Sequence, residues 1–217
     1  MPAIPVAFSR QWSFRLPVLT RQMKAQYVEA FFKDGFLRLS SFESFRKHPD
    51  ELRRDGQEGR VAMEIEAPNG TSSILGANGQ EAYILCASTI ETVPPISPNN
   101  DQSAFRILDC LGFADAISRQ IPGFVGGVEG LCSYRDNTMI RKKDAGLIKP
   151  PEANEDAGRW FAEQQSYVGK QVIDAYFMKH SRFAHESEYR FIWFGEGMPR
   201  QFLDITCPAA LKFCERA

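Results

Sequence analysis

Alternating apolar and polar positions predict several short strands along the chain. Residues 12–16, 36–40 and 61–65 alternate with a period of two, which is typical of strands with one buried face. The run 82–87, Ala-Tyr-Ile-Leu-Cys-Ala, is apolar throughout and is typical of a central strand. The segment 189–194, Tyr-Arg-Phe-Ile-Trp-Phe, carries rings on both faces and therefore predicts another central strand.

Apolar residues at three-and-four spacing predict helices between these strands. One helix opens at Thr20 and ends before Gly35, which is a natural C-cap. Ser41 can cap a short helix, residues 103–120 have helical spacing, and a further helix covers about residues 155–168.

Turns that contain glycine connect the predicted strands. Asn69-Gly70 and Asn78-Gly79 are typical of hairpin turns, and Gly126-Gly127 precedes a predicted strand at 128–134. Together the elements predict an α+β fold with a mostly antiparallel, curved or split sheet and helices packed on it. No long linker rich in Gly, Ser or Pro divides the chain, so we expect a single domain, residues 1–217.

The composition, with 43% hydrophobic and 24% charged residues, is that of a globular protein with a sizeable core. The five cysteines are odd in number and widely spaced, so we expect them to be reduced. No apolar run approaches the roughly 18 residues of a membrane span, and the amino terminus lacks the features of a signal peptide. We therefore expect a cytoplasmic protein without a membrane partner.

The formal charge of −1 argues against binding to nucleic acid mainly through bulk positive charge. Two local basic stretches lie within residues 10–24 and 135–149. Such clusters are most often solvated faces of a protein. They favour a nucleic-acid partner only slightly.

Charged residues cluster where the central strand at 189–194 begins. Strand alternation places Glu186, Glu188 and Arg190 on one face, about 7 Å apart in steps of two residues, at the rim of a hydrophobic sheet. Neighbouring carboxylates raise each other's pKa, and a guanidinium counteracts this effect. The group is a candidate for acid/base chemistry or for stabilising a cation, and an ion pair that fixes a loop is the structural alternative.

The segment 176–190, Tyr-Phe-Met-Lys-His-Ser-Arg-Phe-Ala-His-Glu-Ser-Glu-Tyr-Arg, resembles the carboxy-terminal motif of a bacterial family known as domain of unknown function 2971. Members of that family begin with a short aromatic and basic strand, similar to residues 12–15. A helix, a strand-turn similar to 36–45 and a strand similar to 83–88 follow. The resemblance therefore touches most of the chain.

That family is distantly similar to ADP-ribosyltransferases, which combine a basic residue on an early strand with a glutamate on a late strand, often as Glu-x-Glu. By this resemblance Glu188 matches the late glutamate and Glu186 matches its partner two positions earlier. Arg15 or Arg38 matches the early basic residue, which would bind the pyrophosphate of NAD⁺ through bidentate hydrogen bonds. The resemblance thus implies an ADP-ribosyltransferase-like fold with NAD as substrate.

The resemblance also implies a polar residue on a middle strand and a ring that stacks on nicotinamide. Ser40, Ser41 or Tyr134 matches the polar position. Phe42, Phe45 or Tyr134 is a candidate for the stacking ring.

These residues suit the chemistry that the resemblance implies. Nicotinamide leaves NAD⁺ as a neutral ring, so the reaction needs stabilisation of an oxocarbenium-like ribose rather than a general acid. Glu188 on the ribose 2′-hydroxyl would supply that stabilisation, and Glu186 would orient or deprotonate the acceptor. We therefore expect an NAD-dependent ADP-ribosyltransferase, either a bacterial toxin or a phage-defence effector, that modifies a nucleic acid or a protein. Hydrolysis of NAD⁺ is the nearest enzymatic variant.

A non-catalytic module that binds a nucleotide, an antitoxin or another partner is the alternative. One difference from the resembled family supports this alternative: residues 45–49, Phe-Arg-Lys-His-Pro, stand where that family usually has Asn-Asp-Pro. The three histidines, His48, His180 and His185, lack the spacing of metal ligands, so we expect no metal. Loss of activity in Glu188→Gln separates the enzyme from the module.

Overall fold

The computed structural model describes residues 17–47, 49, 55–56, 58–67, 70–77, 82–90, 101–137, 139–143, 156–160, 162, 173–197 and 201–217. They belong to two compact units. The first contains Met1–Ser41, Glu81–Leu131 and His185–Ala217, and the second contains Phe42–Gln80 and Cys132–Ala184. The predicted strand at 12–16 and the turn at Asn78-Gly79 lie outside the described residues.

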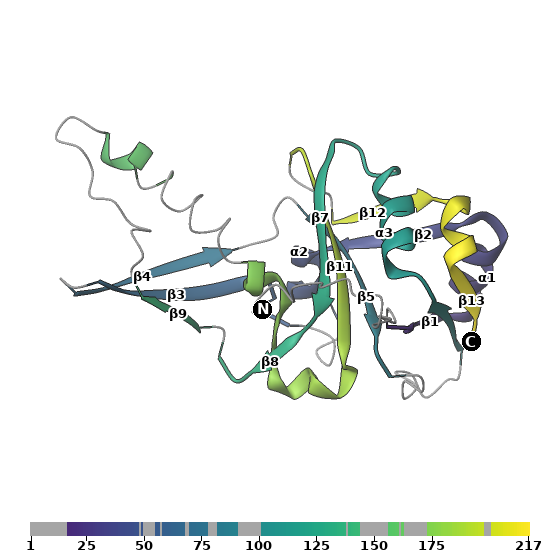
Figure 1. Ribbon diagram of the computed structural model, residues 1–217, viewed down its shortest axis with the longest axis horizontal. Coiled ribbons are helices and arrows are strands. Elements are labelled where there is room, and N and C mark those ends of the chain that lie inside the picture. Colours follow the sequence, from purple (N-terminus) through teal and green to yellow (C-terminus); the bar gives the residue numbers. More distant parts are fainter. Residues whose placement is uncertain are drawn as a thin grey trace, which may run out of the picture. The chain divides into compact units, whose positions relative to one another are not determined.

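The first unit is built on an eight-stranded sheet in which every described pairing is antiparallel (Figure 1). In chain order its elements are β1 (Leu19–Lys24), α1 (Ala25–Asp34), β2 (Phe36–Ser41), β5 (Ala82–Ser88), β6 (Gln102–Ile107), α3 (Cys110–Ser118), β7 (Phe124–Leu131), β11 (Glu188–Gly195), β12 (Phe202–Thr206), the 3-10 helix η3 (Pro208–Phe213) and β13 (Cys214–Arg216).

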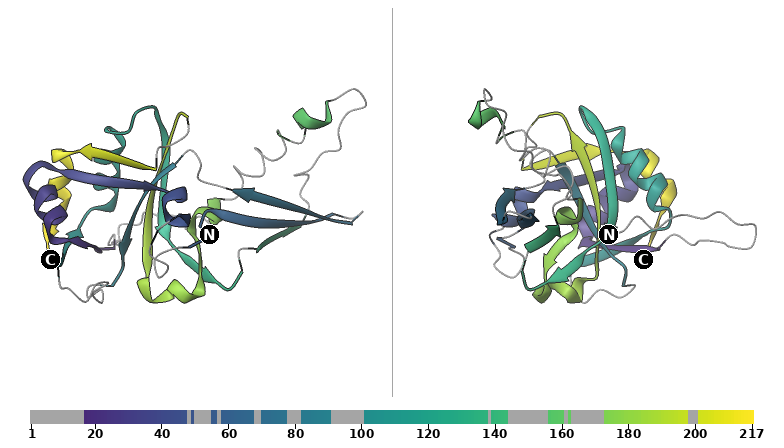
Figure 2. Two further views of the ribbon diagram at one scale, coloured as in Figure 1. Left: turned by 180° about the vertical axis from the view of Figure 1, so that it is seen from behind. Right: turned by 60° about the vertical axis from the view of Figure 1, so that its left-hand side comes forward.

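The sheet forks at β5. One edge of β5 pairs with β11 over its whole length, and β11 in turn pairs with β7, the neighbouring strand in both views of Figure 2. The other edge pairs with β2 through Tyr83 and Ile84 and with β1 through Ser88. On this second edge, residues 85–87 lie between the points where β2 and β1 join, and on the first edge they pair with β11.

Helices α1, α3 and η3 pack on one face of this sheet and enclose the core of the first unit. Rings dominate this core. Phe31 of α1 stacks on Phe105 of β6, with ring centroids 4.6 Å apart, and Phe113 of α3 contacts Phe191 of β11. The core residues of β11 are Tyr189, Phe191 and Trp193, so by alternation Glu188, Arg190 and Ile192 lie on the opposite face.

The helix predicted from Thr20 begins five residues later than expected. Residues Leu19–Lys24 form β1, which pairs with all six residues of β6, and α1 starts at Ala25. The apolar residues Leu19 and Met23 fit both periods, and pairing with β6 decides for the strand. The predicted C-cap is confirmed, because Gly35 has a φ of 75° and its N–H donates to the carbonyl of Phe31.

The helix predicted for 103–120 is wrong over its first half. Residues Gln102–Ile107 form β6 instead. Asp109 is the N-cap of α3, and its carboxylate accepts a hydrogen bond from the N–H of Gly112. Phe105 and Ile107 are two residues apart and both reach the core, as strand geometry requires. The glycines Gly126-Gly127 lie within β7 rather than before a strand.

The second unit contains two small sheets. Strand β3 (Arg60–Ala67) pairs antiparallel with β4 (Gly70–Ala77) through the predicted hairpin, and parallel with β9 (Met139–Lys143). Strand β8 (Ser133–Arg135) pairs parallel with β10 (Met178–His180). The remaining elements are α2 (Phe42–Arg46), the 3-10 helix η1 (Ile173–Phe177) and the 3-10 helix η2 (Ser181–Glu186), which crosses into the first unit.

These elements confirm the predicted α+β class and its mostly antiparallel sheet. Of the helix predicted at 155–168, residues 157–160 are helical and most of the remainder lies outside the described part. None of the described helices is long and apolar enough to cross a membrane.

Candidate functional site

Of the candidate residues in the first unit, Glu188 lies with Arg190 on the face of the sheet opposite the helices. Ser88 of β5 lies across from Glu188 on one side and from Thr20 on the other, and Arg190 lies across from Cys86. Residues that lie directly opposite each other in a ladder share a face. The polar residues of β1, β5 and β11 therefore meet at the end of β5 where β1 joins it.

Glu188 and Arg190 form a buried ion pair at this place. The Nε of Arg190 donates to Oε1 of Glu188 at 2.5 Å, and the side chains are 1% and 5% exposed for Arg190 and Glu188 respectively. Glu188 is the first residue of β11 and pairs with the last residue of β5, so the charges lie at the end of these strands as expected, but their side chains are buried. Burial and the hydrogen bond from Arg190 together hold the Glu188 carboxylate in one orientation.

Arg21 of β1 brings a second guanidinium to Glu188. Its Nη1 donates to the carbonyl of Cys86 at 2.5 Å, within the stretch of β5 between the two branches of the sheet. Burial lowers the pKa of Arg21, and the negative charges of Cys86 and Glu188 act in the opposite direction. The side chain of Arg21 thus supplies a hydrogen-bond donor to β5 at the fork, and the charge of Glu188 acts on its guanidinium.

Glu186 is not part of the strand that carries Glu188. It ends η2, and Ser187 between the two glutamates has a φ of 43°, which breaks the strand alternation. The hydroxyl of Ser88 donates to the carbonyl of Glu186 at 2.8 Å and the N–H of Thr89 donates to the carbonyl of Ser187 at 3.0 Å. The expectation that Glu186 and Glu188 alternate on one strand was therefore wrong, although both flank Ser88.

Arg38, one of the two predicted pyrophosphate ligands, is engaged elsewhere. It lies on β2 and makes a bidentate ion pair with Asp204 of β12, at 2.6 and 2.8 Å, with both side chains about half exposed. The guanidinium lowers the pKa of Asp204 through these hydrogen bonds. Ser40 and Ser41 pair with Ile84 and Tyr83 at the start of β5, and Ser41 is buried.

The predicted aromatic residues belong to the second unit. Phe42 starts α2, is fully buried, and lies 5.8 Å from Tyr176 between ring centroids. Phe45 lies half-buried on the same helix, and Tyr134 lies half-buried on β8, opposite Lys179 of β10. Phe42 therefore serves as a packing residue in its unit, and Arg15 lies outside the described residues.

The sequence analysis did not single out Arg21. The sequence shows that Arg21 is basic and precedes the first acidic residue. The pattern around it predicted a helix, however, so Arg21 was not expected on a strand of the sheet. The structure places Arg21 on β1, the first described strand. No group of three or more His, Cys, Asp or Glu in the described part of the chain is arranged to hold a metal ion.

Comparisons with models of known protein families, with curated proteins and with solved structures found no match. The functional argument therefore depends on the residues of this chain and on their geometry.

Proposed function

We propose that this chain is an NAD-dependent ADP-ribosyltransferase in which Glu188 is the catalytic carboxylate. The observation that carries the proposal is a buried carboxylate on a late strand, Glu188, paired with Arg190, next to a strand whose Cys86 carbonyl accepts a hydrogen bond from Arg21 of an early strand. The resemblance of residues 176–190 to the family of unknown function supports the same assignment. It makes Glu188 the matching residue independently of the fold.

In the proposed reaction the bond between the ribose and nicotinamide breaks ahead of full attack by the acceptor. Positive charge develops on the ribose, and the Glu188 carboxylate stabilises it while accepting a hydrogen bond from the 2′-hydroxyl. Arg190 holds the carboxylate in place through Oε1. Because Glu188 is only 5% exposed, NAD⁺ has to displace the groups that cover it.

Arg21 is a better proposed partner of the NAD⁺ phosphates than Arg38. Arg21 reaches the carbonyl of Cys86, which lies across the ladder from Arg190, whereas Nε and Nη2 of Arg38 both donate to Asp204. A guanidinium binds pyrophosphate well because its planar donors match two phosphate oxygens. Glu186, which flanks Ser88 beside Glu188, is the proposed group that orients the acceptor.

The acceptor is proposed to be a nucleic acid or a protein, as for a bacterial toxin or phage-defence effector with or without an antitoxin. The basic stretches contribute less positive charge than their composition suggested. Arg21 is turned into the fork, and Arg141 forms an ion pair with Glu64 at 2.8 Å. Charge alone therefore favours neither class of acceptor.

The test is incubation of the purified protein with labelled NAD⁺ and, separately, total RNA, DNA and cell lysate. Nicotinamide release and label transfer should both fall by about a hundredfold or more in Glu188→Gln. Because this change disturbs a buried ion pair, a second variant, Glu188→Asp, keeps the charge but withdraws it by one methylene, and it should show the same loss of activity with a smaller loss of stability than Glu188→Gln. Arg216→Gln, which removes an exposed ion pair with Glu29, is the control that should keep full activity.

A non-catalytic binding module is the second candidate, favoured by the burial of Glu188 against Arg190. A carboxylate placed for structure alone needs no access for NAD⁺. In that case no NAD⁺ turnover occurs with any acceptor, although the protein is folded. Release of nicotinamide without label transfer would instead identify a hydrolase.

A further inference from the structure

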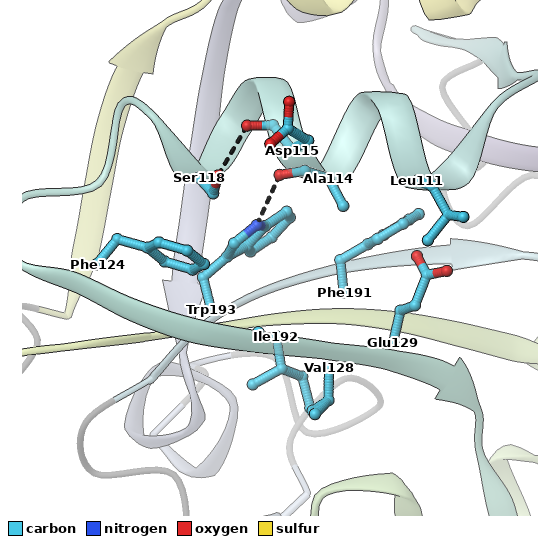
Figure 3. Close-up of a pocket in the computed structure, with 11 residues that line it drawn as sticks. Leu111, Ala114, Asp115, Ser118, Phe124, Val128, Glu129, Phe191, Ile192 and Trp193 are labelled. Atoms are coloured by element: carbon cyan, nitrogen blue, oxygen red, sulfur yellow. Dashed lines mark hydrogen bonds between the residues drawn. The ribbon is translucent and has the colours of Figure 1, made fainter. Parts of the chain in front are cut away.

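A pocket of about 290 Å³ opens between α3 and β7 in the first unit, on the helix-bearing face of the sheet (Figure 3). It is separate from the proposed catalytic residues, because Glu188 and Arg190 lie on the other face. The residues that line it are Leu111, Ala114, Asp115, Ser118, Phe124, Gly127, Val128, Glu129, Phe191, Ile192 and Trp193.

Aromatic rings form one wall of the pocket, and hydrogen bonding fixes the largest of them. Phe191 and Trp193 point from β11 toward α3, with their rings stacked 5.9 Å apart at an angle of 16°. The indole N–H of Trp193 donates to the carbonyl of Ala114 at 3.1 Å. Phe124 and Leu111 complete the apolar lining and are exposed, at 39% and 59%. The pocket is therefore preformed and accessible from solvent.

Gly127 keeps the space above Trp193 open. It lies directly across from Trp193 in the ladder between β7 and β11. A Cβ at this position would lie 3.7 Å from both the Phe124 ring and the Trp193 ring, and 3.0 Å from the carbonyl oxygen of Ile192. A side chain here would therefore enter the space between the two rings, and glycine is the residue that leaves it free for a ligand.

Glu129 places a carboxylate at the other end of the pocket. The hydroxyl of Tyr189 hydrogen-bonds to this carboxylate, and its Oε2 is buried without a partner among the described residues. Burial raises the pKa of Glu129, and the nearby Asp109 carboxylate acts in the same direction. The carboxylate of a glutamate rotates easily about its last side-chain bond. A ligand donor that reaches either oxygen can therefore lead to both oxygens of Glu129 being hydrogen-bonded.

The charged residues that line the pocket are acidic. Asp115 of α3 lines it beside Glu129, and no basic residue is among the lining residues. The neighbouring Arg119 pairs with Asp115 at 2.8 Å, but both side chains are largely exposed, so this pair is screened by solvent. An anionic ligand is disfavoured in such a pocket, whereas a cation gains from the carboxylates and from the faces of the rings.

We propose that this pocket binds a small organic cation that has an apolar or aromatic body and an N–H donor. The body lies between Phe124 and Trp193, in the space that Gly127 leaves open, and the N–H group donates to Glu129. The volume lies at the lower end of the range for small-molecule sites, so the ligand is a compact one-ring or short-chain cation. This inference is independent of the proposed function, since it uses the other face of the sheet.

The test uses benzamidinium as the probe, because it is planar, carries N–H donors and stays cationic from about pH 5 to about pH 8. Isothermal titration calorimetry of the full chain at about pH 8, where the probe is cationic and the Glu129 carboxyl is ionised in spite of its raised pKa, should give a dissociation constant on the order of 0.1 to 1 mM. Benzamide, a neutral molecule of nearly the same shape, should bind about tenfold more weakly or worse. Equal binding of the two probes, or no binding of benzamidinium, would overturn the proposal.

Three variants locate the probe. Glu129→Gln keeps the shape of the side chain and should weaken benzamidinium binding by about tenfold or more. Gly127→Ala should also weaken binding, because its methyl group enters the space between the rings. The matched control is Gly126→Ala, where a Cβ meets nothing within 4 Å, and binding should stay unchanged. Unchanged affinity in a folded Glu129→Gln protein would show that the cation binds elsewhere.

Discussion

Glu188 and Arg190 lie two residues apart on β11 and form an ion pair, with 2.5 Å between Oε1 and Nε, in which neither side chain is more than 5% exposed. Removing one partner of such a pair leaves a buried charge without its counter-ion. Arg190→Met should therefore lower the free energy of unfolding by about 3 kcal/mol. Urea denaturation followed by circular dichroism measures this change.

The double variant tests whether the loss comes from the pair itself. In Glu188→Gln together with Arg190→Met, both charges are gone, so the total loss should be smaller than the sum of the single losses by about 1 to 3 kcal/mol. Strict additivity would mean that the two side chains are stabilised by other groups and not by each other. Arg21, which also faces Glu188, is unchanged throughout the cycle.

Several elements could be predicted from sequence because one local signal decided each of them. The continuous apolar runs at 82–87 and 189–194 became β5 and β11, the two adjacent strands at the fork of the sheet. Gly35 became a left-handed C-cap, since a glycine after an amphipathic segment has few other roles. Such signals depend on nearest neighbours, so no tertiary information was needed.

The paired strands β1 and β6 could not be predicted, because their apolar residues fit two periods at once. Leu19 and Met23 are four residues apart, which suits both a helix and a strand. Each of the two segments is stabilised as a strand by pairing with the other at six positions. This long-range pairing cannot be recognised in the sequence of either segment alone. Because β1 was not predicted, the position of Arg21 in the candidate site could not be predicted either.

The sequence also could not predict which of the charged side chains are buried. Arg38 and Arg21 both lie on short strands near the amino terminus, yet one is exposed beside Asp204 and the other fills the fork. The difference arises from strand order: β2 has β12 as a neighbour on one side, whereas β1 meets β5 only at Ser88 and leaves a gap. Strand order is set by the whole chain and not by the residues around each arginine.

These two arginines should differ sharply in their effect on stability. Arg38→Gln removes an exposed pair and should change the free energy of unfolding by about 1 kcal/mol or less. Arg21→Met removes the donor to the Cys86 carbonyl and the counter-charge to Glu188, so it should lower that free energy by about 3 kcal/mol. Thermal and urea unfolding of both variants compares them directly. Similar losses would show that the fork is not closed by Arg21.

Gly35 is expected to be irreplaceable in the connection between α1 and β2. Its φ is 75°, and a Cβ there would lie 2.4 Å from the carbonyl carbon of Cys207. Gly35→Ala combines backbone strain with this clash and should lower the free energy of unfolding by about 3 kcal/mol. The control is Gly197→Ala, where φ is also positive but no atom lies within 4 Å, so about 1 kcal/mol is expected. Equal losses in urea unfolding would mean that α1 and Cys207 can move apart.

Glu129 should give the protein a stability term that decreases as the pH rises. Burial raises its pKa above the ordinary value of 4.5, so the folded state keeps the proton at pH values where the unfolded chain has released it. Its contribution is therefore fully present below pH 4.5 and is lost as the pH rises through the raised folded pKa. Glu129→Gln cannot titrate, so the unfolding free energy of the variant minus that of the wild type should increase between about pH 4 and about pH 7.

A second glutamate supplies a control with the opposite sign. The hydrogen bond from Arg216 lowers the pKa of Glu29, so its contribution to stability is present above the ordinary pKa and is lost as the pH falls. The same difference for Glu29→Gln should therefore decrease as the pH rises toward and just past the ordinary pKa of 4.5, between about pH 3 and about pH 5.5. Urea titrations of the wild type and both variants at several pH values provide the comparison. Slopes of the same sign for the two variants would contradict the raised pKa of Glu129, which burial and the nearby Asp109 carboxylate cause.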